Sequence, residues 1–228
     1  MPVRAESVGY RRQAVGMTPE AAIPPTVGAI LAGGLARRMG GGDKPLSVMG
    51  GRAMLARIVE RLMPQVTRVV LNANGDPHRF DSFRLPVAAD SLPDHPGPLA
   101  GVLAALDWTA NIDPGVAWVV TLPGDVPFVP RDLVARLHAA RQRGGATLAC
   151  AASRGRAHSV IALWPVAIRD ELRAALAGHG IRKVGLFLQQ RGCATTAWPA
   201  APVDPFFNIN TPDDLAEADR LAVLHPDL

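Results

Sequence analysis

The sequence is poor in cysteine, tyrosine and lysine, and it contains no long hydrophobic run. Its two cysteines, Cys150 and Cys193, form no Cys-x-x-Cys motif, which excludes a disulfide scaffold and a zinc module and suits a reducing, cytoplasmic compartment. The longest uncharged stretch near the N-terminus, Ala21–Ala36, is shorter than the roughly 20 residues of a membrane span and includes Pro24 and Pro25. We therefore expect no membrane segment and no export signal.

The charge balance is mildly basic and does not point to a nucleic-acid partner. The 228 residues carry a net charge of +4, and 48% of them are hydrophobic, which is typical of a soluble chain able to bury its own core. Lys44 and Lys183 are the only lysines, and the arginines are spread along the chain. The sequence has no RNP-like motif, zinc finger or basic stripe with interleaved aromatics, so we expect an anionic small molecule as ligand and no nucleic acid.

The first 25 residues differ in pattern from the remainder of the chain. Residues 1–25 include four prolines and show no hydrophobic period, so we predict a disordered tail there and a single domain over residues 26–228. Strands and helices then alternate, which predicts an α/β fold: a Rossmann-like three-layer sandwich with a mostly parallel sheet. The expected strands are Val27–Ala32, Val66–Leu71, Leu85–Ala89, Val116–Leu122, Ala146–Ala151 and Ser159–Trp164; the expected helices are Ala53–Met63, Pro98–Trp108, Pro130–Arg143, Pro165–Leu176, Arg182–Gln190 and one capped by Thr211; short extended pieces are expected at Thr195–Trp198 and Phe206–Asn208.

Polar or glycine residues follow each of the first four expected strands. A Gly-rich loop follows the first strand, Asn72 the second, Asp90 the third and Asp125 the fourth. In a parallel sheet, ligands bind beyond the carboxyl ends of the strands, where these positions would meet. The pattern therefore predicts one ligand site at this edge of the sheet.

The Gly-rich loop between Gly33 and Lys44 has the composition of a phosphate-binding segment. It holds five glycines within ten residues, and it includes Arg37, Arg38 and Lys44 as cations. Glycines allow backbone N–H groups to turn toward a polyphosphate, and the cations offset its charge. The loop lacks both the P-loop pattern and the Gly-x-Gly-x-x-Gly pattern of dinucleotide-binding proteins.

The segment Leu31–Leu46 resembles the signature of nucleotidyltransferases that activate a phosphate-bearing acceptor. More narrowly, Leu-Ala-Gly-Gly-x-Ala-Arg-Arg-Met-Gly-Gly-x-Asp-Lys is similar to the molybdenum cofactor guanylyltransferases of the molybdopterin nucleotidyltransferase family. Further motifs match in order over roughly residues 27 to 222. They are Asn72-Ala73-Asn74, Asp90-Ser91-Leu92, Gly97-Pro98-Leu99-Ala100-Gly101, the aspartate Asp125, and Asn208-Ile209-Asn210-Thr211-Pro212-Asp213-Asp214-Leu215.

The resemblance implies a reaction and its partners. GMP would pass from GTP to the terminal phosphate of molybdenum-molybdopterin, with release of pyrophosphate, to form the guanine dinucleotide cofactor. The acceptor phosphate, with a second pKa near 6, is mostly dianionic at about pH 7, so the reaction requires no general base. Other molybdenum cofactor biosynthesis proteins, or the apoenzymes that receive the cofactor, are the implied protein partners.

The resemblance also assigns roles to residues. Asp125 is expected to hold Mg²⁺, with Mn²⁺ as the other candidate, because Mg²⁺ takes one or two carboxylates together with phosphate oxygens and water. Lys44 and Arg38 are expected to act with Asp125 in catalysis through the charge they place near the triphosphate. The expected nucleotide-binding residues are Leu31, Ala32, Gly33, Gly34, Lys44, Asn72, Asp90 and Asp125, and the expected acceptor-binding residues are Asn208, Asn210, Arg154 and Arg156.

Three other functions remain compatible with these motifs. A cytidylyltransferase making the cytosine form of the cofactor is the nearest, although Gly33-Gly34 favours guanine. Sugar-phosphate nucleotidyltransferases share the loop but are usually longer. A nucleotide-binding regulatory protein is disfavoured by Lys44, Asp90 and Asp125, since binding alone would not require the metal-ligating aspartate.

Overall fold

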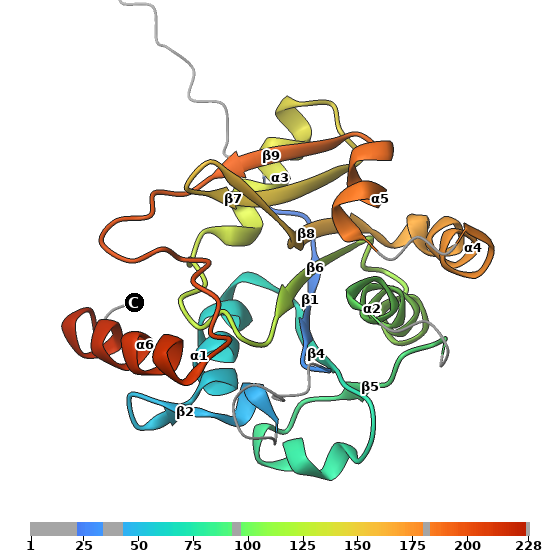
Figure 1. The fold of residues 1–228 in the computed structure, drawn as a ribbon. Helices are drawn as coiled ribbons and strands as arrows, with labels where there is room; N and C mark the ends of the chain where they lie inside the picture. Colours follow the sequence, from blue (N-terminus) through green and yellow to red (C-terminus); the bar gives the residue numbers. More distant parts are fainter. Residues whose placement is uncertain (1–21, 34–42, 93–96, 180–182, 227–228) are drawn as a thin grey trace, which may run out of the picture.

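The computed structural model describes residues 22–33, 43–92, 97–179 and 183–226, which form a three-layer α/β sandwich (Figure 1). Its central sheet has seven strands in the order β5-β4-β1-β6-β8-β7-β9. The strands are β1 (Thr26–Leu31), β4 (Arg68–Asn72), β5 (Val87–Ala88), β6 (Trp118–Pro123), β7 (Leu148–Ser153), β8 (Arg156–Pro165) and β9 (Cys193–Ala197), and a separate hairpin pairs β2 (Val48–Met49) with β3 (Arg52–Ala53).

Helices cover both faces of the sheet. The α-helices are α1 (Met54–Leu62), α2 (Pro98–Ile112), α3 (Leu133–Arg143), α4 (Arg169–His179), α5 (Val184–Gln190) and α6 (Pro212–Leu224). Figure 1 shows α2, α4 and α5 on one side of the sheet, while α6 lies beside α1 and the β2–β3 hairpin. The short 3₁₀ segments are η2 (Lys44–Leu46), η3 (Met63–Gln65), η4 (Pro77–Phe83) and η5 (Val166–Ile168).

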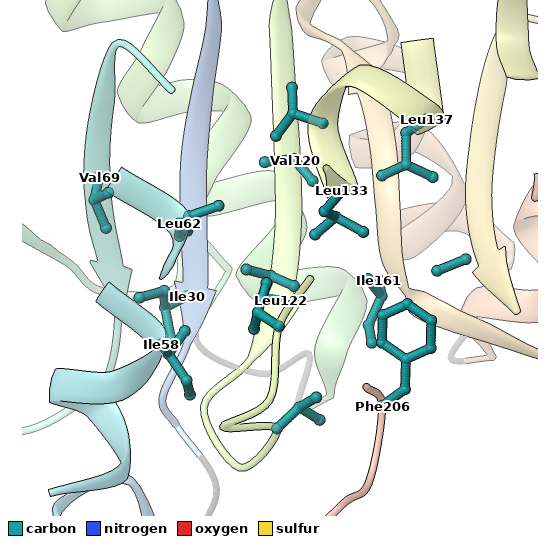
Figure 2. Packing of buried hydrophobic residues seen from close by; sticks show 14 of the residues in the cluster. Ile30, Ile58, Leu62, Val69, Val120, Leu122, Leu133, Leu137, Ile161 and Phe206 are labelled. Atoms are coloured by element: carbon teal, nitrogen blue, oxygen red, sulfur yellow. The ribbon is translucent and has the colours of Figure 1, made fainter. Parts of the chain in front are cut away.

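A hydrophobic core on each face of the sheet explains why the sequences of the strands are nearly continuous apolar runs. Val27 and Ala29 of β1 pack in the core that includes α2, whereas Ile30 packs with Ile58 and Leu62 of α1 (Figure 2). A central parallel strand buries both of its faces, so neither set of alternating side chains is polar. No helix among the described residues has the length and apolar character that a membrane crossing requires.

The expected mostly parallel sheet is confirmed, and the carboxyl ends of its first strands meet as expected. β1 pairs in parallel with β4 and β6, and β4 pairs in parallel with β5. The register places Leu31 opposite both Asn72 and Pro123, and Asn72 opposite Ala88. The segments after these four strands therefore surround a common edge.

The expected strand Ser159–Trp164 is too short, because β8 begins at Arg156 and runs antiparallel to β6 and β7. Arg154 and Gly155 form a two-residue hairpin turn with φ values of 49° and 72°. Two successive positive φ values are typical of the tight turns that join antiparallel strands, and such turns usually carry asparagine or aspartate before glycine. Because arginine is unusual in that position, the sequence pattern did not predict the hairpin.

Several expected boundaries are also wrong. The third α-helix begins at Leu133 rather than at Pro130, because a turn at residues 131–132 precedes it. The segment expected as Pro165–Leu176 begins as η5 and becomes α-helical only at Arg169. The piece expected at Phe206–Asn208 is not a strand, and the sequence pattern predicted neither η4 nor the β2–β3 hairpin.

Candidate active site

Lys44 and Asp125 form an ion pair at the carboxyl edge of the sheet. The Lys44 Nζ lies 2.5 Å from Asp125 Oδ2, and the two side chains are only 11% and 18% exposed. Lys44 opens η2, and Asp125 lies in the turn after β6. Gly124 lets these segments approach, since a Cβ there would come within 2.9 Å of Pro45 Cγ. The fold thus joins a cation and a carboxylate that are 81 residues apart in sequence.

The segment before α6 completes this group of side chains. Asn208 Nδ2 donates to Asp125 Oδ1 at 3.0 Å, and Lys44 Nζ donates to Asn210 Oδ1 at 2.8 Å. The backbone follows the same path, because the Ile209 N–H donates to the Asp125 C=O at 3.1 Å. We call Lys44, Asp125, Asn208 and Asn210 the Lys44 cluster. Both oxygens of Asp125 are thereby fixed in direction.

Asp214 holds the end of that segment in place, a role that the sequence analysis did not assign. Its carboxylate accepts the N–H groups of Asn210 at 2.8 Å and Thr211 at 2.9 Å, while Thr211 Oγ1 accepts the Asp214 N–H at 3.1 Å. The Asn210 N–H, followed by the hydroxyl and N–H of Thr211, lowers the pKa of Asp214, which overcomes the opposing effect of burial. This capping box starts α6 and orients the backbone of Asn210.

A second polar group, the asparagine cluster, consists of Asn72, Asn74 and Asp90. Asn72 Nδ2 donates to Asp90 Oδ1 at 2.9 Å, and Asn74 Nδ2 donates to Asp90 Oδ2 at 2.8 Å. The Asp90 N–H returns a bond to Asn74 Oδ1 at 2.9 Å. A Cβ on Gly101 of α2 would overlap Asn72 Oδ1, so this glycine leaves the room that the cluster requires. Asn72 and Asp90 are thus brought together as expected, and Asn74 is added to them.

The backbone at the end of β1 is largely committed to the sheet. The Ala32 N–H donates to the Asn72 C=O at 2.8 Å, and the Leu31 C=O accepts the Gly124 N–H at 2.9 Å. Gly33 is exposed, and a Cβ built on it would meet no atom within 4 Å. A ligand could therefore approach Gly33 closely, but the Ala32 N–H is already used. Gly34 and Arg38 lie outside the described residues.

A pocket of about 630 Å³ adjoins the Lys44 cluster between the β7–β8 hairpin and the segment 204–210. Its lining includes all four expected acceptor-binding residues, Asn208, Asn210, Arg154 and Arg156. Arg154 Nε lies 3.0 Å from Asp204 Oδ2, although the Arg154 side chain is 69% exposed. The structure therefore gathers both asparagines and both arginines around one cavity.

His158 and Phe206 form part of the wall of this pocket. Their ring centroids are 5.0 Å apart, and His158 Nε2 lies 2.8 Å from Ser153 Oγ. Burial is the main effect that lowers the pKa of His158, which favours the neutral ring. The pocket thus combines two aromatic side chains, whose rings are tilted by 51° to each other, with amide and guanidinium groups, which suits a molecule that carries both apolar surface and negative charge.

The donor set at Asp125 determines what kind of metal ion the site can accept. Among the described residues, no group of three or more histidine, cysteine, aspartate or glutamate side chains is arranged to hold a metal. Asp125 is a lone carboxylate beside a lysine and two asparagines. This fits Mg²⁺ or Mn²⁺ only if phosphate oxygens and water complete the coordination, as is common for Mg²⁺ bound with a nucleotide.

The chain is similar to known proteins over most of its length. The family model described as a MobA-like NTP transferase domain matches residues 28–192. The chain is 56% identical to the molybdenum cofactor guanylyltransferase of Nitrobacter hamburgensis, over 89% of this chain and 97% of that protein. It is 55% identical to the molybdenum cofactor guanylyltransferase of Rhodopseudomonas palustris, over 90% of this chain and 98% of that protein. The crystal structure of molybdopterin-guanine dinucleotide biosynthesis protein A from Archaeoglobus fulgidus has the same fold, with a TM-score of 0.68 and 24% identity over 87% of this chain and 99% of that one.

Proposed function

This chain belongs to the MobA-like NTP transferase family, and we propose that it transfers GMP from GTP to the terminal phosphate of molybdenum-molybdopterin. The observation that carries the proposal is the position of the Lys44–Asp125 pair. It lies at the edge of the sheet that also holds the asparagine cluster, and it adjoins the pocket lined by Asn208 and Asn210. A transferase requires such a centre, flanked by one site for the nucleotide and another for the acceptor.

The nucleotide is assigned to the side of the asparagine cluster. Asn72 and Asp90 would contact the guanosine, next to the open backbone at Gly33. The triphosphate would then run toward Lys44, with Gly34 and Arg38 contributing from the Gly-rich loop. An amide can both donate to and accept from a base or ribose, and a carboxylate can accept from either, whereas a lysine suits a polyphosphate as a point charge.

The acceptor is assigned to the pocket. Its terminal phosphate would lie beside Asn208 and Asn210, next to Asp125, because that end of the pocket meets the reacting centre. Arg154 and Arg156, on the β7–β8 hairpin, would then contact more distant parts of the acceptor. The aromatic side chains of His158 and Phe206 give this pocket apolar surface for the remainder of the acceptor.

The proposed chemistry is a displacement at the α-phosphorus of GTP. An acceptor phosphate oxygen forms a bond to this phosphorus, and the bond to the bridging oxygen of the β-phosphate breaks, so pyrophosphate leaves with the electron pair. Because the acceptor is already ionised near pH 7, the protein needs to align two anions and offset their charge rather than remove a proton. Lys44 supplies part of that offset.

Asp125 would hold the divalent cation when the nucleotide is bound. Mg²⁺ or Mn²⁺ supplies charge compensation between phosphate oxygens. Lys44 pairs with Asp125 Oδ2, and it would also contact a phosphate oxygen of the bound nucleotide as a point charge.

Labelled nucleotides test this proposal directly. Incubation of the protein with molybdenum-molybdopterin, Mg²⁺ and GTP labelled at the α-phosphate should place the label in the dinucleotide cofactor. Label at the γ-phosphate should appear only in pyrophosphate. Absence of transfer from GTP, or transfer to a sugar phosphate instead of molybdopterin, would refute the proposal. Transfer from CTP alone would assign the protein to the cytidylyl reaction.

The cellular setting follows from the same proposal. Cys150 and Cys193 are both free thiols, as expected for a protein of the cytoplasm. Proteins that supply molybdenum-molybdopterin, and apoenzymes that receive the finished cofactor, are the partners that this reaction would require.

A further inference from the structure

We propose that Arg79 is a positioning residue that sets the spacing between the two nucleotide-binding ends of the site; this inference rests on the proposed function. Arg79 lies in η4, outside every motif identified in the sequence. Its guanidinium lies between the backbone of Asn74 and the side chain of Asp43. It therefore connects the asparagine cluster to the residue that precedes Lys44.

The contact with the asparagine cluster is made through the backbone. Arg79 Nη2 donates to the Asn74 C=O at 2.7 Å. The chain bends tightly here, because Gly75 has φ of +84° and a Cβ on it would come within 3.1 Å of Arg79 Nη1. The guanidinium also lies over the Phe80 ring, 4.8 Å from its centroid. Since Phe80 is a buried core residue, the guanidinium has a firm support.

The contact on the other side is an ion pair. Arg79 Nε lies 3.1 Å from Asp43 Oδ2, and the two side chains are only 26% and 25% exposed. Asp43 is the N-cap residue of η2, yet its side chain makes no capping hydrogen bond. Its backbone does support η2, because the Asp43 C=O accepts the Leu46 N–H at 2.9 Å. The carboxylate is thus directed to Arg79. Because Asp43 directly precedes Lys44 in the chain, the position of Asp43 determines the position of the Lys44 backbone.

These contacts form a continuous path from Asp90 through Asn74, Arg79 and Asp43 to Lys44. The guanidinium presents its donors in a rigid planar fork, whereas an ammonium group on a flexible stem holds two partners in a less fixed relation. Each end of the path also has contacts of its own: Asn74 and Asp90 bond each other, and Lys44 bonds Asp125. Loss of Arg79 should therefore leave both ends formed but wrongly spaced.

Fragment binding separates this role from simple structural support. A ligand that spans two half-sites binds more tightly than either fragment only when the sites are held at the matching distance. In Arg79→Ala, we expect the affinities for guanosine and for tripolyphosphate to stay within about threefold of wild type, while the affinity for GTP falls at least about tenfold. Displacement of a labelled nucleotide by each compound gives the three affinities.

Four further variants, one of them a double substitution, sharpen the test. Arg79→Lys keeps the positive charge but loses the planar, forked set of donors of the guanidinium. Its affinity for GTP should therefore be little higher than that of Arg79→Ala. Asp43→Asn should weaken GTP binding as well, and combining it with Arg79→Ala should add little, since both changes break the same link. Arg68→Gln is the matched control, because it removes the ion pair between Arg68 Nε and Asp113, 3.3 Å apart, away from the site. Melting curves confirm that each variant is folded.

Unchanged GTP affinity in folded Arg79→Ala would overturn the inference. So would an equal loss for GTP and for either fragment, which would assign Arg79 to local support of one end. Failure of the proposed function is recognised separately, because wild-type protein would then not bind GTP. In that case the same comparison is made with the nucleotide that the wild type does bind and with its nucleoside.

Discussion

Asp125 is the residue in which the two halves of the site meet. One of its carboxylate oxygens contacts Lys44, which follows the Gly-rich loop, and the other accepts from Asn208 in the C-terminal segment. The side chain is partly exposed at a strand end and is not part of a hydrophobic core. Its charge can therefore be removed without removing a packing contact.

Asp125→Asn should keep the fold and lose the reaction. We expect a rate of nucleotidyl transfer at least about a hundredfold lower, near 3 kcal/mol in the activation free energy, because a preorganised charge is lost where charge develops. Single-turnover transfer across a Mg²⁺ titration measures the effect, with melting curves as the control. Near wild-type transfer with the same metal dependence would show that Asp125 is only a turn residue.

Gly101 offers a test of the asparagine cluster from outside it. Gly101→Ala places a methyl group against Asn72 Oδ1, so the Asn72 side chain must shift, and we expect its hydrogen bond to Asp90 to be disturbed. We expect the KM for GTP to rise roughly tenfold and the melting temperature to fall by a few degrees, as is usual when a packed site is overfilled.

A double-mutant cycle isolates the cause of that effect. With the side chain already shortened in Asn72→Ala, the added methyl group has nothing to displace, and Gly101→Ala should raise KM little further. If Gly101→Ala raises the KM for GTP by the same factor with and without Asn72→Ala, the methyl group does not act through Asn72. The contact between α2 and the cluster would then be unimportant for GTP binding.

At the level of elements, the packing of α3 against β1 gives the protein a pH-dependent stability. His138 of α3 is 2% exposed, and its Nε2 lies 2.8 Å from Thr26 Oγ1 of β1. Burial, reinforced by the charge of Arg141, lowers the pKa of His138 to about 4. The unfolded chain takes up this proton near pH 6.5, so the stability from a neutral His138 is complete above that pH and declines as the pH falls toward 4.

His138→Phe should remove most of this pH dependence. The wild-type free energy of unfolding should decline between pH 6.5 and 4 by an amount on the order of 3 kcal/mol from this residue, whereas the variant should show a shallower slope. Some slope should remain, because burial also lowers the pKa of His158. Denaturant unfolding at pH 7 and pH 4.5 measures the difference, with the exposed His78→Gln as control. Equal slopes in both proteins would exclude His138 as the cause.

Which elements the sequence could predict depends on how local their causes are. β1 and β6 are apolar runs buried on both faces, and the residues after them follow from the topology of a parallel sheet. The sequence analysis predicted a strand in the region of β8 but not its antiparallel direction. The reason is that Arg154 occupies a left-handed turn position that usually carries asparagine or glycine. α3 was predicted to start at Pro130, but residues 131–132 form a turn, and the Asp132 side chain accepts from Trp198 Nε1 and makes no capping hydrogen bond.

The same distinction applies to the site. Asn208 and Asp125 are 83 residues apart, so only the family resemblance, and no local pattern, suggested that they belong to one site. The link between Arg79 and Asp43 was not predicted at all, because neither residue type nor spacing distinguishes it from a surface ion pair. Thr211 was predicted as a helix cap, but the hold of Asp214 on Asn210 depends on the path of the C-terminal segment.

In the whole molecule, the two halves of the chain form different parts of the site. The carboxyl ends of β4 and β5 and the residues after them carry the asparagine cluster, whereas the β7–β8 hairpin and the segment before α6 surround the pocket. Lys44 and Asp125 lie where the two parts meet. The proposed reaction follows this division, with the nucleotide on one side, the acceptor on the other and the phosphates between them.

The most direct test of this account is the nucleotide preference of the complete protein with molybdenum-molybdopterin as acceptor. Polar groups aimed at a base edge reject the wrong base, because buried partners are then left unpaired. We predict that kcat/KM for pyrophosphate release with GTP exceeds that with CTP by at least about thirtyfold, or about 2 kcal/mol. Equal use of GTP and CTP, or release of pyrophosphate only with CTP, would contradict the account.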